Sequence, residues 1–305
     1  MNKAQHPRAF LITIIWTLFL LYLGSVVHAT ESSLACPDWP TCFGTMVPEM
    51  TGGVFWEHLH RLVAGGLMLF FLAATYLAYR ESPRYPGIRR WALLGVGLLL
   101  VQAGLGGITV IFLLPDAVST SHLGLAFLFL ALATVLYTVS ADTWEVGAGP
   151  DPRTVMTTRR VAVAGAVLAF VQSIVGAAVR HTDAGVACPD IPLCLGRWIP
   201  PLEYGLVALH FGHRLLGILL LGVVLWLGHH VFWKSKSRRL KGLGVAVSLL
   251  AVGQVLLGFL SVYLGLAVVP VSLHTLLAAT LLTLLVALAT LTWAPQAGSP
   301  DGVEA

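Results

Sequence analysis

The chain has 305 residues, of which 57% are hydrophobic and only 10% are charged, and its mean hydropathy is +0.85. A soluble domain normally carries about 25% charged residues, so this composition excludes an ordinary soluble protein and indicates an integral membrane protein. The formal net charge of +4 does not indicate a nucleic-acid partner, because the basic residues fall in short loops between apolar stretches rather than on one basic face.

Eight apolar stretches follow one another along the chain, and each is long enough to cross a bilayer as a helix. The first follows the basic residues Lys3 and Arg8, as the apolar part of a secretory signal does, but its length favours a helix that is retained. The sequence therefore predicts an all-α integral membrane protein with eight transmembrane helices, at about residues 9–27, 56–79, 91–112, 119–140, 160–179, 204–232, 241–264 and 270–293.

The loops between these stretches differ in charge. Fourteen of the 18 lysines and arginines fall on one side of the predicted membrane, and positively charged loops usually face the cytoplasm. We therefore expect a multi-pass protein of the cell membrane with both termini in the cytoplasm and both cysteine-containing loops outside.

Chemically distinctive residues recur at one offset along the chain. The recurrence predicts two pseudosymmetric four-helix bundles, at residues 1–140 and 160–293, related by an axis along the membrane normal. A polar cytoplasmic linker would occupy residues 141–159, and a disordered tail residues 294–305. The pairs lie 152 or 153 residues apart: Cys36 and Cys188, His60 and His213, and His122 and His274.

Each half carries two histidines, on its second and fourth predicted helices. A lone histidine in a membrane helix is more often a hydrogen-bonded polar residue than a ligand, but two facing imidazoles in an apolar bundle suit the axial positions of a haem iron. Zinc would need two further ligands that these helices lack. The candidate ligand pairs are His60 with His122 and His213 with His274.

Three arginines lie near the predicted outer surface beside these pockets. Arg61 and Arg214 directly follow the first histidine of each half, and Arg180 ends the fifth stretch. They could pair with haem propionates in a bidentate manner. The alternative, strongest for Arg180, is that the side chains reach into the lipid headgroups.

The two halves differ at one acidic position. Glu57 lies three residues before His60 and shares its helix face, whereas His210 stands at the equivalent place before His213. Glu57 could act as a general base or stabilise a developing cation, or it could simply cap the helix N-terminus. The difference suggests that only the N-terminal pocket performs chemistry. His58 is expected at the membrane interface.

The segments CPDWPTC at 36–42, EHLHR at 57–61 and SHLG at 121–124, with their counterparts CPDIPLC, HR and LHT, resemble haem A synthase over essentially the whole chain. That family converts haem O to haem A by oxidising the C8 methyl group to a formyl group. The resemblance implies that His60 and His122 bind the haem O substrate, with Glu57 as the catalytic carboxylate. It also implies that His213 and His274 hold a permanent haem b.

The reaction implied by this resemblance needs partners that the sequence does not name. These are an electron donor and a source of haem O, such as haem O synthase, and homo-oligomerisation stays open. A di-haem electron carrier of the cytochrome b type would use the same four histidines without turnover. A transporter built from repeats is disfavoured, because the helices lack paired interruptions by glycine and proline.

All four cysteines lie in the two repeated loops. On an oxidising outer face we expect two structural disulfides, Cys36–Cys42 and Cys188–Cys194, while an exchangeable thiol pair remains the alternative. Each loop precedes a histidine-bearing helix and is expected to cover the outer face of a pocket, with Trp39 near the porphyrin edge.

Overall fold

The computed structural model describes residues 4–81, 87–141 and 151–293. This part of the chain is helical without any strand, and eight of its helices are long and apolar enough to cross a membrane, so the all-α membrane fold is confirmed. The helices are α1 His6–Ala29, α2 Gly52–Arg80, α3 Gly87–Ile111, α4 Asp116–Ser140, α5 Pro152–His181, α6 Gly205–Lys234, α7 Arg238–Tyr263 and α8 Val268–Leu291, with a 3₁₀ turn, η1, at Ala184–Val186.

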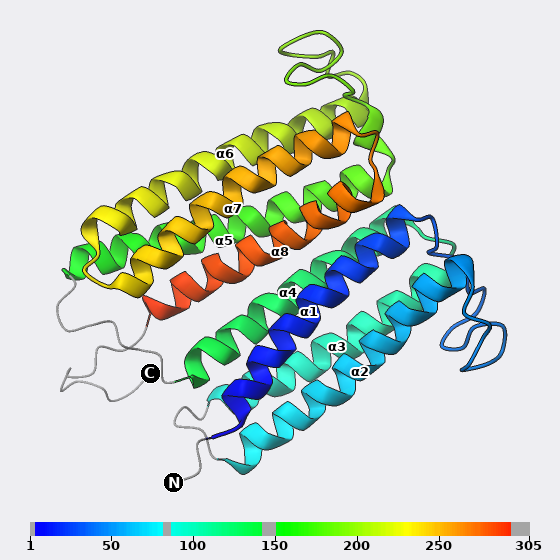
Figure 1. The fold of residues 1–305 in the computed structure, drawn as a ribbon, viewed down its shortest axis with the longest axis horizontal. Helices are drawn as coiled ribbons and strands as arrows, with labels where there is room; N and C mark the ends of the chain where they lie inside the picture. Colours follow the sequence, from blue (N-terminus) through cyan, green and yellow to red (C-terminus); the bar gives the residue numbers. More distant parts are fainter. Residues whose placement is uncertain (1–3, 82–86, 142–150, 294–305) are drawn as a thin grey trace.

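The helices form two sets of four that lie side by side (Figure 1). In the first set each of α1 to α4 packs against its neighbours in a closed ring, and α5 to α8 form a second ring with the same pairwise contacts. The two sets meet where α1 and α4 lie against α5 and α8. This arrangement is compatible with the expected pair of bundles, while their symmetry and origin by duplication stay predictions.

The largest hydrophobic core lies across the boundary between the two sets. It joins Leu21 of α1 and Phe127 of α4 to Leu227 of α6 and Leu285 of α8. A second core lies inside the first set, where Phe71 of α2 packs edge-to-face on a phenylalanine of α4. The two sets therefore share buried apolar surface and are not separate packing units.

One domain boundary differs from the expectation. Helix α5 begins at Pro152, so residues 152–159, which the sequence analysis assigned to the linker, are helical. The side chain of Asp151 accepts hydrogen bonds from the backbone N–H groups of Arg153 and Thr154, and a proline at the first helical position has no N–H to leave unsatisfied. The remainder of the expected linker, 142–150, and the expected tail, 294–305, lie outside the described residues.

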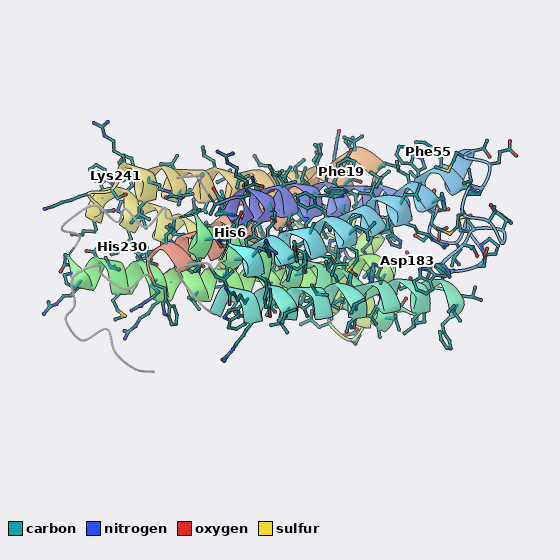
Figure 2. All side chains as sticks on the ribbon, turned by 90° about the horizontal axis from the view of Figure 1, so that it is seen from below. His6, Phe19, Phe55, Asp183, His230 and Lys241 are labelled. Carbon is teal, nitrogen blue, oxygen red and sulfur yellow. A yellow bond between two sulfur atoms is a disulfide. The ribbon has the colours of Figure 1, made fainter. Side chains whose placement is uncertain are left out.

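The labelled residues of Figure 2 identify the two ends of the helix assembly. Phe55 and Asp183 lie at the end that carries the cysteine loops, and His230 and Lys241 lie at the opposite end. Both cysteine loops are thus on one side of the molecule. Which side of a membrane this is stays a prediction from loop charge.

Candidate functional site

Each of the four candidate ligands packs against a glycine of the preceding helix. A methyl group added to Gly24 of α1 would lie 3.0 Å from Cε1 of His60, and one added to Gly106 of α3 would lie 3.1 Å from Cε1 of His122. The second set repeats this contact between Gly176 and His213 at 2.8 Å and between Gly258 and His274 at 3.0 Å. The absence of a side chain at these glycines is what lets each imidazole lie against the neighbouring backbone.

The two histidines of each set are close enough to interact electrostatically, His60 with His122 and His213 with His274. The structure therefore brings together the residues that the sequence analysis paired. Within the described part of the chain, the Nδ1 atom of every one of these four rings is buried without a hydrogen-bond partner. A pair of buried imidazoles in an apolar helix bundle is a donor set that fits the two axial positions of a haem iron.

Glutamines support three of the four histidines. Nε2 of Gln102 on α3 lies 3.4 Å from Nε2 of His122, and Nε2 of Gln254 on α7 lies 3.3 Å from Nε2 of His274. In α5, Nε2 of Gln172 donates to the backbone carbonyl of His213 at 2.9 Å. The contacts of Gln102 and Gln254 restrict the orientation of the rings, as second-shell partners do at metal sites, whereas Gln172 holds the backbone at His213.

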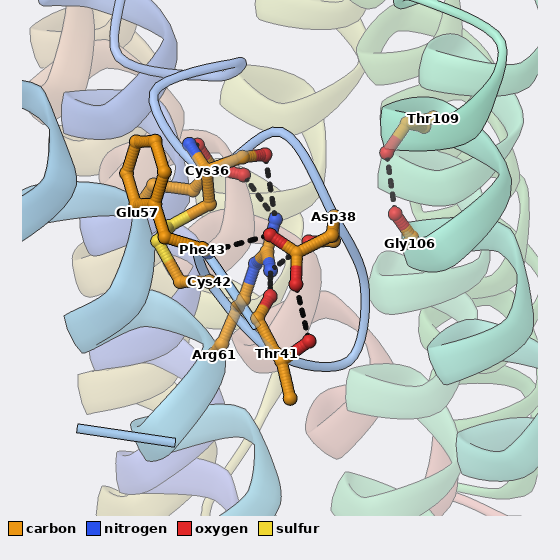
Figure 3. A network of polar contacts seen from close by, with 9 residues as sticks. All are labelled: Cys36, Asp38, Thr41, Cys42, Phe43, Glu57, Arg61, Gly106 and Thr109. Carbon is orange, nitrogen blue, oxygen red and sulfur yellow. Dashed lines mark hydrogen bonds and ion pairs between the residues drawn. A yellow bond between two sulfur atoms is a disulfide. The ribbon is translucent and has the colours of Figure 1, made fainter. Parts of the chain in front are cut away.

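Glu57 is buried between the first cysteine loop and α2 (Figure 3). One carboxylate oxygen accepts a hydrogen bond of 2.8 Å from the backbone N–H of Cys36, and the other pairs with Arg61 at 2.5 Å. Helix α2 begins at Gly52 with Thr51 at the N-cap position, so Glu57 lies beyond the first turn and does not have the capping role that the sequence analysis left open. The carboxylate instead links the loop to the helix that carries His60.

Arg61 and Arg214 hold the two cysteine loops in the same way. Nη1 of Arg61 donates to the carbonyl oxygens of Asp38 and Thr41 at 2.7 and 2.6 Å (Figure 3). Arg214 donates from Nη1 to the carbonyls of Asp190 and Leu193 at 2.9 and 2.8 Å, and from Nη2 to Cys188 at 2.5 Å. Sequence reasoning missed this anchoring role, because it depends on the folded path of the loops.

Both expected disulfides are present, with Cα atoms 4.8 Å apart in Cys36–Cys42 and 4.7 Å apart in Cys188–Cys194. Each second cysteine exchanges backbone hydrogen bonds with the residue three positions later. The bonds confirm the pairing and leave the choice between a structural and a redox role open.

The side chain of Asp38 accepts several hydrogen bonds within the first cysteine loop. Its carboxylate accepts hydrogen bonds from the hydroxyl of Thr41 and from the backbone N–H groups of Phe43 and Gly44. The Thr41 hydroxyl, followed by these amides, holds the pKa of Asp38 below its usual range. The adjacent Trp39 crosses to α3, where a methyl group added to Gly107 would lie 2.9 Å from its indole ring.

Trp39 therefore packs on the residue that follows Gly106, the glycine against which His122 lies. The second set has Ile191 and Phe259 at the places of Trp39 and Gly107. The aromatic residue is thus on the loop in the first set and on the helix in the second.

A polar cluster joins the two sets near the cysteine-loop end. Nη2 of Arg180 donates to the backbone carbonyl of His28 at 3.3 Å, and the His28 and His181 rings meet edge-to-face at 5.1 Å. Nδ1 of His181 lies 2.9 Å from the Thr120 hydroxyl. The sequence analysis gave His28 and His181 no role, although His28 and Arg180 are separated by the repeated offset of 152 residues.

The position of His58 differs from the expectation. The sequence analysis placed it at the membrane interface, but its side chain is 2% exposed and Nε2 lies 3.0 Å from the backbone carbonyl of Met46. The prediction was wrong because the cysteine loop folds back over this face of α2 and removes it from lipid.

The fold and the histidines define the class of protein: a multi-pass, all-α membrane protein with a pair of buried histidines in each set of four helices. Residues 8–54 and 49–286 match the profile of the cytochrome oxidase assembly proteins, COX15-CtaA, and the chain belongs to this family, which includes the haem A synthases.

Three relatives illustrate this membership. The chain is 33% identical to the haem A synthase of Halalkalibacterium halodurans over 69% of this chain and 70% of that protein. It is 31% identical to that of Symbiobacterium thermophilum over 82% and 83%, and 28% identical to that of Lysinibacillus sphaericus over 92% and 94%.

Proposed function

We propose that this protein is a haem A synthase, which oxidises the C8 methyl group of haem O to the formyl group of haem A for assembly of a terminal oxidase. The observation that supports this most directly is the pair of buried bis-histidine pockets in a chain of this family. Haem O and haem A are the substrate and product, and the oxidation requires an electron-transfer partner.

In this proposal His60 and His122 hold haem O in the first pocket, and His213 and His274 hold haem b in the second. The difference between Glu57 and His210 supports the assignment, because only the first pocket has an acidic group one helical turn from a ligand. Haem b, when bound, supplies a redox-active iron for electron transfer.

Glu57 is the proposed catalytic carboxylate. Its negative charge is held in a fixed place by Arg61 and the Cys36 N–H, which suits stabilisation of positive charge that develops at the substrate. The same contacts tie the carboxylate to the loop, so movement of the loop would also move Glu57.

Arg61, Arg214 and Arg180 are the proposed partners of haem propionates. The first two already donate to loop carbonyls and would have to exchange these bonds for propionate oxygens. Arg180 keeps Nε buried without a partner among the described residues, and its contacts therefore favour it for this role.

A di-haem electron carrier of the cytochrome b type is the second candidate. It is favoured by the engagement of both Glu57 oxygens in contacts that anchor the loop, which a purely structural residue would also show. The two candidates differ in haem composition: a carrier holds two identical haems and has no product.

The deciding experiment is extraction of the haems from the purified protein and from the His60→Ala and His213→Ala variants. We expect haem O or haem A to be depleted in His60→Ala and haem b to be depleted in His213→Ala, because each variant removes one axial ligand of one pocket. If haem b alone is found, at two per chain, and its content falls equally in both variants, the result would contradict the synthase and support the carrier.

A further inference from the structure

A second cluster of metal-binding residue types lies under the first cysteine loop. A ring nitrogen of His58 and the sulfur atoms of Cys36 and Cys42 all lie within 4.8 Å of one another. The two cysteines are fully buried and His58 is 2% exposed. This cluster is distinct from the four histidines of the proposed haem pockets.

The hydrogen bond of His58 fixes its tautomer. A backbone carbonyl only accepts hydrogen bonds, so Nε2 of His58 must carry the proton that it donates to Met46. Nδ1 then carries a lone pair, and it is buried without a partner in the described part of the chain. In this tautomer the nitrogen that presents a lone pair, as a metal ligand requires, belongs to a ring that lies beside two sulfur atoms.

The second loop provides an internal comparison. Cys188 and Cys194 form an equivalent disulfide, but the residue packed against them is Phe211, which takes the place of His58 one residue after the equivalent of Glu57. The two loops share the disulfide and the arginine anchor, and they differ in this neighbour. An apolar ring suits a purely structural disulfide, whereas a buried imidazole with one partnerless nitrogen is costly unless that nitrogen has a ligand to bind.

We infer that Cys36, Cys42 and His58 form a binding site for a thiophilic cation such as Zn²⁺ when the first disulfide is reduced. A dithiol reductant would supply two electrons and two protons, breaking the S–S bond and forming its own disulfide. The cation then displaces the two thiol protons and is bound by two thiolates and Nδ1 of His58.

The chemistry of this donor set fits such a cation. Zn²⁺ binds two cysteines and one histidine in tetrahedral sites that keep a fourth position open, with ligand atoms about 3.5–4 Å apart. Once the S–S bond is broken the sulfurs can separate to that spacing within the 4.8 Å cluster.

The test uses the full-length purified protein, oxidised or reduced with a phosphine that is then removed without air. Zn²⁺ affinity is measured by competition with a chromophoric chelator, and bound zinc is counted by elemental analysis. We expect one tightly bound Zn²⁺ per reduced chain and none per oxidised chain. His58→Phe should weaken binding beyond the roughly 10–100-fold that loss of a second-shell partner costs, because it removes a direct ligand.

Phe211→His is the matched gain-of-site variant, and it should allow the reduced second loop to bind a second ion. Cys188→Ala/Cys194→Ala should retain the first site, whereas Cys36→Ala/Cys42→Ala should lose it. If His58→Phe does not fold, these variants still decide the question. Absence of tight binding to the reduced protein, or tight binding that His58→Phe leaves unchanged, would overturn the inference.

Discussion

At the scale of single residues, an experiment on Glu57 has to separate a catalytic role of the carboxylate from its structural role in anchoring the first cysteine loop. Replacement by alanine would remove both the charge and the acceptor for the Cys36 N–H, so loss of activity would have two explanations. Glutamine keeps an oxygen that can accept from Cys36, while it removes the negative charge and the acceptor for Arg61, which retains its bonds to the loop carbonyls.

We expect Glu57→Gln to lower the rate of haem O oxidation by about 10²-fold or more, which is the usual contribution of a positioned acid or base. The haem content and the thermal unfolding midpoint should stay near those of the unchanged protein. The measurement is product formation per bound haem O, with His210→Gln as the control at the equivalent place. Full activity in Glu57→Gln would exclude the carboxylate from the chemistry.

At the scale of one element, the first cysteine loop depends on the ionised form of Asp38. Because the folded loop lowers the pKa of this carboxyl below 3.8, the ionised group stabilises the loop at pH values above 3.8. This stabilisation is lost as the pH falls through the lower pKa of the folded state. The loop should therefore be ordered at neutral pH and loosen in acid.

Hydrogen exchange of the segment containing Phe43 and Gly44, corrected for intrinsic exchange, measures this effect. Protection should decrease on acidification below about pH 4, where carboxyl groups normally titrate. Asp38→Asn should show low protection at every pH, because a neutral amide is a weaker acceptor for these donors. Equal protection in both proteins at neutral pH would contradict this role.

At the scale of the whole molecule, the contact between the two helix sets depends on a glycine. A methyl group on Gly124 of α4 would overlap Cδ1 of Ile174 on α5. Between the other two helices of this boundary, the hydroxyls of Ser25 on α1 and Thr275 on α8 lie 3.2 Å apart. The sets are thus held at a fixed separation by small residues and polar pairs, as is common between membrane helices.

Gly124→Ala should destabilise the protein by about 1–3 kcal/mol, the usual cost of overpacking, and lower its thermal unfolding midpoint in detergent. Ile174→Ala should restore much of this loss when the two changes are combined, because it removes the overlapping atom. Gly97→Ala is the control, since a methyl group there would contact nothing within 4 Å. Additive effects of the two changes would argue against direct contact.

Some of these features could be predicted from the sequence and others could not. The eight helices and the four histidines were predictable, because apolar length and a repeated offset are properties of the chain itself. Burial of His58 and the anchoring of loops by Arg61 were not, because both depend on how a loop of irregular backbone folds over a helix. The supporting glycines carried a signal in their common offset, but glycine is frequent in membrane helices for other reasons.

By itself the sequence determined an eight-helix membrane protein with two histidine pairs and two cysteine pairs, because hydropathy and spacing are local. Only the tertiary structure decided which buried polar groups have hydrogen-bond partners. In the described part of the chain, the four candidate ligands and His58 each keep a buried nitrogen without a hydrogen-bond partner. Glu57, Arg61 and Arg214 instead form hydrogen bonds with the cysteine loops. The reason is physical: hydrogen-bond satisfaction depends on contacts between segments distant in the chain, and no local pattern encodes them.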